Sequence, residues 1–443
     1  MKADIRIAWI LARGSERREW WRISLTALGA LAATAFALGA VVIAAVPGQV
    51  SIPHAHGLLN QPGQRAGVVL TLVLLLVPVL GFLGQCARIG AVHRHRRMAV
   101  MRLTGASPAQ VRRIAAVESA LPSLPGSLVA FAAFCVLLAV LGHAPRPAAW
   151  AGFAAVSLTV PVAAALVSVF ALRHAVASPL DQVRRTGSDR GRRAVFCFLL
   201  AGLLISAVGL LVLTPVSVRS AAWPVLVLAL VFLTGAGAIW TAGATAAFMG
   251  RRLTRRARHP AVLIAAGRLA HDPWAAARTH AALLLVTVVG VGFVGVRAVL
   301  LADLLEGDHM AGDPAFYTTG IDLAGSAVLV ALTISLCGLA VGTAESLATR
   351  RGGLAVQAAA GVPRTVLVWA ALLETALPLA PAVLLAGAGG TTVYVMYAAV
   401  VGTSVPMLPL LVPVAVYAAC LLAAATSLPL LRRVTHPAEL RFS

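Results

Sequence analysis

Two glutamates, Glu118 and Glu374, each lie where a long apolar segment begins. A carboxylate beside hydrocarbon is costly, so such a residue usually reaches water, pairs with a cation or takes part in function. Two interpretations stay open. Each glutamate is either a helix-end carboxylate that faces water or pairs with nearby arginines, or part of an ion pair that couples or gates helix movement.

The two glutamates belong to an internal repeat. Residues 97–130 and 353–386 are identical at eleven of 34 positions without a gap. The identical positions that are not aliphatic pair Gly105 with Gly361, Glu118 with Glu374, Pro122 with Pro378 and Pro125 with Pro381. Proline inside a membrane helix kinks it or adjusts its packing. Pro122 and Pro378 are therefore gating candidates beside the glutamates.

A basic segment, Arg88–Arg102, precedes the first glutamate. Gly105 is expected to end a short helix there, and Ser107 to cap the next one. Pro108 suits the first turn of that helix, where no amide hydrogen bond is lost. The pattern predicts a helical elbow at the membrane surface, which can pass force from a cytoplasmic partner to a membrane helix.

Long apolar blocks must position these residues. Hydrophobic residues make up 60% of the 443 residues and charged residues only 12%, whereas about a quarter of a soluble domain is charged. Blocks of about 20 apolar residues are long enough to cross a bilayer as helices. We predict an all-α integral membrane protein whose ten transmembrane helices span about residues 23–46, 66–87, 116–142, 148–172, 194–215, 222–249, 279–301, 320–344, 366–390 and 405–431.

Positive charge is distributed unevenly between these spans. With both termini in the cytoplasm, this topology places only four of the 36 Lys and Arg residues outside: Arg65, Arg146, Arg219 and Arg297. An excess of Lys and Arg is typical of the cytoplasmic loops of membrane proteins. The prediction is a multi-pass protein with both ends in the cytoplasm.

Several classes of function are excluded by the residues that the chain offers. Its net charge of +21 comes in short arginine clusters without interleaved aromatics, which argues against nucleic acid as a partner. Lys2 is the only lysine, so a phosphate-binding Gly-Lys-Ser/Thr loop is missing. The pairs His54/His56 and His93/His95 lack companion ligands for a metal. No catalytic residue, metal or cofactor is predicted in this chain.

A basic run, Arg96–Val111, contains hydrophobic-Arg-hydrophobic-x-Gly-Ala-Ser-x-x-Gln, and Glu118 follows it. This pattern resembles the FtsX-like permease domain of MacB-type ABC transporters. The second copy carries it more weakly, at Leu354–Val356, Gly361–Pro363 and Glu374. Ten spans in a 4+2+4 arrangement also resemble bacitracin-export-type permeases, although the large extracellular domain of those proteins is missing.

The resemblance implies a bacterial plasma-membrane permease subunit. Its partner is a cytoplasmic ABC ATPase, in two copies, which binds ATP and Mg²⁺. The other partners are membrane lipid and an amphipathic substrate, such as an antibiotic, a peptide or a lipid-like molecule, that the complex exports or extracts. Three alternatives stay open: a subunit of the same family that passes on force or signals without transport, a secondary transporter, and a polytopic membrane enzyme.

The resemblance also implies domains and contacts. Residues 1–193 form a four-helix FtsX-like module with an N-terminal amphipathic helix, 194–250 a two-helix connector, and 251–443 a second module. The residues expected to couple to the ATPase are Arg96, Arg97, Met101, Arg102, Gly105, Ala106, Ser107, Pro108, Arg112, Arg113, Gly361, Pro363 and Arg364. The second elbow is less basic, because Arg102, Arg112 and Arg113 correspond to Ala358, Val368 and Trp369. The first elbow is therefore expected to dominate coupling.

Overall fold

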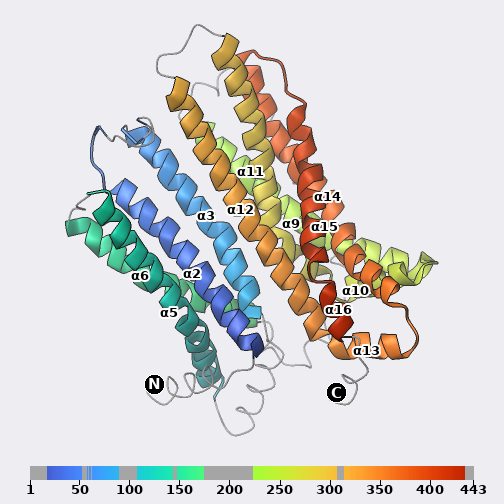
Figure 1. Cartoon of the computed structure of the whole chain (residues 1–443). Coiled ribbons are helices and arrows are strands. Elements are labelled where there is room, and N and C mark those ends of the chain that lie inside the picture. Colours follow the sequence, from blue (N-terminus) through green and yellow to red (C-terminus); the bar gives the residue numbers. More distant parts are fainter. Residues whose placement is uncertain are drawn as a thin grey trace. The chain divides into compact units, whose positions relative to one another are not determined.

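The protein is an all-α integral membrane protein, as predicted (Figure 1). The computed structural model describes residues 17–51, 57, 59–60, 62–88, 107–142, 147–173, 223–306 and 314–434. Within these ranges every regular element is helical, and eight helices are long and apolar enough to cross a membrane. The predicted span 194–215, both histidine pairs and the elbow residues Arg96–Ala106 lie outside the described residues.

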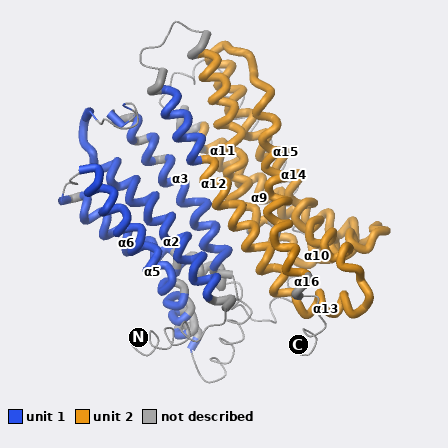
Figure 2. The backbone as a smooth tube through the Cα atoms, in the orientation of Figure 1, with its two compact units in different colours: residues 1–185, 315–327 blue, residues 186–314, 328–443 orange. Residues whose placement is uncertain are grey.

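The chain forms two compact units, coloured separately in Figure 2. Unit 1 comprises Met1–Arg185 and Ala315–Ala327, and unit 2 comprises Thr186–Pro314 and Val328–Ser443. The module boundaries expected near residues 193 and 250 stay a prediction.

Unit 1 contains four helices that correspond to the first four predicted spans. They are α2 (Arg17–Ala44), α3 (Pro62–Arg88), α5 (Pro108–Val140) and α6 (Pro147–Arg173). Helix α2 packs against the other three. A cluster around Leu38, Leu138 and Phe153 fills the space between α2, α5 and α6. In a bilayer such side chains hold helices together by van der Waals packing.

The α2–α5 contact is unusually close. A Cβ atom placed on Gly126 would overlap the backbone carbonyl oxygen of Ala27. Beside it, the Thr34 hydroxyl donates a buried hydrogen bond of 2.9 Å to Ser127 Oγ. Small residues and interhelical hydrogen bonds are what holds helices together in a bilayer, where burial in lipid gives no hydrophobic gain.

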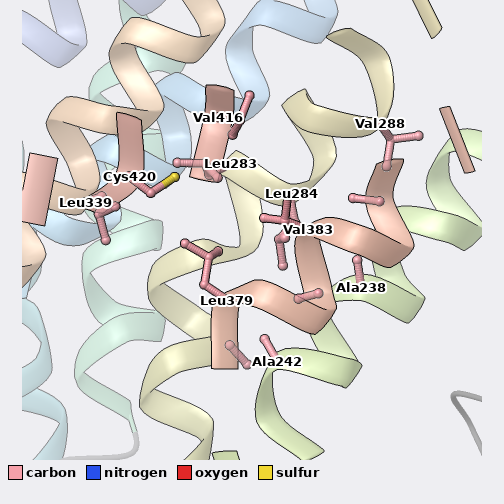
Figure 3. Close-up of a cluster of buried hydrophobic side chains, with 13 residues drawn as sticks. Ala238, Ala242, Leu283, Leu284, Val288, Leu339, Leu379, Val383, Val416 and Cys420 are labelled. Atoms are coloured by element: carbon pink, nitrogen blue, oxygen red, sulfur yellow. The ribbon is translucent and has the colours of Figure 1, made fainter. Parts of the chain in front are cut away.

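Unit 2 is built around α9 (Trp223–Arg256), α11 (Pro273–Glu306) and α14 (Arg364–Val401), which pack against one another. Its remaining elements are α10 (Pro260–His271), the part of α12 (Pro314–Thr349) from Val328 onward, α13 (Arg351–Ala359), η2 (Leu408–Leu411), α15 (Val412–Ala425) and α16 (Pro429–Val434). Figure 3 shows a cluster of buried side chains in unit 2, to which α9, α11, α12, α14 and α15 contribute Ala238, Leu284, Leu339, Leu379 and Val416.

Helix α14 is longer than the predicted span 366–390. Gly389 and Gly390 lie at the end of that span, and glycine weakens helices. The structure explains why the helix continues: a Cβ on Gly389 would overlap Thr234 of α9, and one on Gly390 would crowd the carbonyl oxygen of Val288 on α11. The glycines serve packing. The helix ends instead at Gly402, whose φ is +82°.

Three further boundaries differ from the sequence analysis. The outer loop expected at 302–320 is shorter, because α11 extends to Glu306 and α12 begins at Pro314. The last predicted span is interrupted, being made of η2, α15 and α16. Helix α10 was not predicted as a separate element, although His259-Pro260 marks its start and Leu269 is buried on its apolar face.

Candidate functional site

The two glutamates occupy equivalent positions on equivalent helices. Helix α5 begins at Pro108 and α14 at Arg364, so their starts differ by the same 256 residues as the sequence repeat. Glu118 and Glu374 are each the eleventh residue of their helix. Pro122 and Pro378 are buried one turn further on, and both helices continue through them.

Ser107 caps α5 as the sequence predicts. The Gln110 amide N–H donates to Ser107 Oγ at 3.2 Å, and the Ser107 amide N–H donates to Gln110 Oε1 at 2.8 Å. This reciprocal capping box satisfies two amides that the helix start leaves unpaired. Pro108 fills the first position, and Arg113 is exposed one turn later. The structure describes only the last part of the first elbow, and the capping box holds that part in a defined conformation at the start of α5.

The second elbow is described completely. After α13, Gly361 takes a left-handed conformation with φ +88°. The Val362 amide N–H donates to the Gln357 carbonyl at 3.1 Å, and the Gly361 amide N–H donates to the Ala358 carbonyl at 3.0 Å. This is a Schellman turn. Pro363 precedes the first residue of α14, and Gly361, Pro363 and Arg364 are exposed.

Glu118 forms a buried ion pair with Arg22 of α2. The Arg22 Nη2 donates to Glu118 Oε1 at 3.0 Å, and the two side chains are 3% and 9% exposed. Arg22 lies in the segment that the sequence analysis treated as an N-terminal amphipathic helix. Its partner is 96 residues away, so no local pattern announces the pair.

Glu374 is held by two arginines. Arg350, between α12 and α13, donates from both terminal nitrogens to the two carboxylate oxygens, each at 2.9 Å. It also donates to the Ser346 hydroxyl. Arg268 of α10 contacts Glu374 Oε1 through Nε at 2.9 Å. The sequence pattern predicts neither arginine as a partner of Glu374, and the structure gives both to it.

Residues 67–180 match the family model described as FtsX-like permease C-terminal. The chain carries an FtsX-like permease domain. No curated protein and no solved structure matches the chain.

The FtsX-like domain spans α3, α5 and α6, and therefore includes the first elbow and Glu118. This family supplies the membrane permease component of ABC-type transporters and generally works with a cytoplasmic ABC ATPase. The family prediction is confirmed at this level; the MacB-type and ten-span details stay predictions. Among the described residues, no group of three or more His, Cys, Asp or Glu side chains is placed to hold a metal ion.

The FtsX-like domain and the second repeat pair their glutamates differently. Leu11-Ala12 matches Leu269-Ala270 at an offset of 258 residues, and the same offset aligns Arg22 with His280, a buried histidine of α11. The second repeat takes its cations from α10 and the α12–α13 junction instead. Both repeats pair the glutamate with arginine, but the first supplies one arginine and the second supplies two, from different elements.

We expect Gly361→Val to lower the free energy of unfolding by about 2 kcal/mol, because a left-handed residue with a Cβ costs about 1–2 kcal/mol and β-branching adds strain. No atom lies within 4 Å of the Cβ that the substitution introduces, so the effect isolates the backbone.

Gly352→Val is the matched control. It lies in α13, has no positive φ and also has open space around the new Cβ. Its effect is expected to stay within about 0.5 kcal/mol. Thermal unfolding in detergent micelles measures both variants, and equal losses would contradict the role given to the Gly361 conformation.

Proposed function

We propose that the chain is the permease subunit of an ATP-driven ABC transporter that exports or extracts an amphipathic substrate. A separate ATPase subunit, in two copies, binds ATP and Mg²⁺ at the cytoplasmic face, and both termini of the permease lie on that side of a bacterial plasma membrane. The observation that carries the proposal is the FtsX-like domain whose elbow leads directly into a membrane helix.

The second elbow supports a route for force. Helix α13 is joined to α14 at its C-terminal end by the Schellman turn at Gly361. Arg350, immediately before α13, binds Glu374 on α14 through two hydrogen bonds. The short helix is thus fixed to the long one at both ends. A partner that displaces α13 therefore moves α14, which is 38 residues long.

The first elbow is expected to couple more strongly than the second. Its arginines Arg102, Arg112 and Arg113 can donate charge-assisted hydrogen bonds to an acidic groove of the ATPase. In the second elbow these positions hold Ala358, Val368 and Trp369, and Arg350 is engaged by Glu374.

We expect Gly105→Val or Arg102→Glu to reduce substrate-stimulated ATP hydrolysis of the reconstituted complex by about tenfold, the effect of losing about 1.4 kcal/mol of coupling. Gly361→Val is the matched variant in the second copy and should reduce coupling less. Size-exclusion chromatography checks that each variant folds. Equal sensitivity of the two elbows would refute the asymmetry, and insensitivity of both would refute the assignment of these segments as the ATPase contact.

A further inference from the structure

A pocket of about 340 Å³ lies against Glu374, between α10, the end of α12, α13 and α14. All of its lining residues belong to unit 2. Its size falls in the range of about 300–1,000 Å³ that is typical of ligand sites.

One part of the pocket is cationic. Arg268 and Arg350 line it together with Glu374, so two guanidinium groups face one carboxylate and the three side chains carry a net positive charge. The pKa of Arg268 is lowered to about 10, chiefly by burial; the charge of Glu374 raises it and the nearby charge of Arg350 lowers it. Arg268 therefore stays charged at neutral pH. Gln357 adds an uncharged polar group.

The rest of the pocket is apolar. Leu347, Leu354 and Leu367 form buried parts of its wall, and Leu263 is half exposed beside them. Two glycines, Gly267 and Gly353, also line it, and a Cβ placed on either would meet no atom within 4 Å. The missing side chains leave open space next to the arginines.

We propose that this pocket binds an anionic amphiphile, with a phosphate monoester held by Arg268 and Arg350 and a hydrocarbon chain packed along Leu263 and its neighbours. Arginine suits this ligand because its planar fork matches phosphate oxygens. The apolar wall suits a chain attached to the phosphate. The predicted orientation places these arginines at the depth of inner-leaflet head groups.

In this arrangement the phosphate shares the two arginines with Glu374. The carboxylate is a built-in competitor, because it occupies donors that the phosphate would use. Binding requires only the folded chain, so it is independent of the ATPase and of the transport proposed above.

The test is a titration of the purified full chain, in neutral maltoside micelles, with hexyl phosphate, inorganic phosphate and hexyl glucoside. We expect hexyl phosphate to bind at least about tenfold more tightly than either other probe. Relative to inorganic phosphate, burying two methylene groups already accounts for about that factor. Relative to hexyl glucoside, which has the same chain, the hydrogen bonds between the charged phosphate and the arginines account for it. Equal binding of inorganic phosphate would mean that soluble phosphate is the ligand, and equal binding of hexyl glucoside would mean a plain apolar pocket. Either outcome overturns the proposal.

Variants separate ligand contacts from loss of folding. Arg268→Gln should weaken hexyl phosphate binding about tenfold. Glu374→Gln should strengthen it severalfold, because the competing carboxylate is gone, and a merely damaged pocket would not bind more tightly. Asp303→Asn, the same charge change at an exposed site near the far end of α11, should leave binding unchanged.

Filling the pocket gives a second, independent test. Gly267→Leu should abolish hexyl phosphate binding while the chain stays folded, because the new side chain enters open space and leucine is a better helix former than glycine. Gly352→Leu, on α13 and not among the lining residues, should bind normally. Normal binding to folded Gly267→Leu, or weaker binding to Glu374→Gln, would refute the site.

Discussion

Glu118→Ala is expected to lower the free energy of unfolding by about 3–5 kcal/mol, the usual cost of leaving one member of a buried ion pair without its partner. Arg22 would then carry a charge inside unit 1 with only 3% of its side chain exposed. Its Nε already has no hydrogen-bond partner among the described residues. Unfolding of the purified variant in mixed micelles measures the loss.

Two comparisons show whether the buried charge is the cause. The double variant Arg22→Met with Glu118→Leu removes both charges and should recover most of the loss, because apolar replacement of a buried pair is often neutral. Glu374→Ala should cost less, since its partners Arg350 and Arg268 are 18% and 41% exposed and can be hydrated. Failure of the double variant to recover stability would mean that shape, not charge, is decisive.

Gly126→Ala is expected to cost about 3 kcal/mol, at the upper end of the range for overpacking. The added methyl group would overlap the carbonyl oxygen of Ala27, and backbone cannot move aside as a flexible side chain can. Separating α2 from α5 would also strain the Thr34–Ser127 hydrogen bond and the Arg22–Glu118 pair, which join the same two helices.

Gly67→Ala is the control for this prediction, because Gly67 lies in α3 and its Cβ would meet nothing within 4 Å. This variant should be neutral or slightly stabilising, since alanine favours helices over glycine by about 1 kcal/mol. The two variants are compared by thermal unfolding under identical conditions. A small effect at Gly126 would show that α2 and α5 separate easily.

Local features of the candidate site could be predicted from the sequence, because their causes are local. Ser107 caps α5, and Gly361 ends α13 with a positive φ, through interactions within five residues. The two glutamates could be singled out because they occupy equivalent positions in the two copies of the repeat. Their partners could not be predicted, since Arg22 and Arg268 come from distant helices and only the packed fold brings them to the carboxylates.

The same limit applies to the length of α14. Gly389 and Gly390 weaken an isolated helix, so the local sequence does not account for a helix that continues past them. Their real role depends on Thr234 and Val288, which belong to other helices. Tertiary contact outweighs local propensity at this position, and no pattern within α14 reveals it.

The different partners of the two glutamates bear on how this chain can be re-engineered or can diverge. In the first repeat, transplanting α5 alone into another permease would leave Glu118 without its counter-ion, because Arg22 lies on α2. The ion pair is kept only if both helices are transplanted together. In the second repeat the main counter-ion, Arg350, is 24 residues from Glu374 and travels with it in one short segment. The second elbow is thus the more portable module, and recombination between the two copies is productive only where the cut keeps each carboxylate with its own cation.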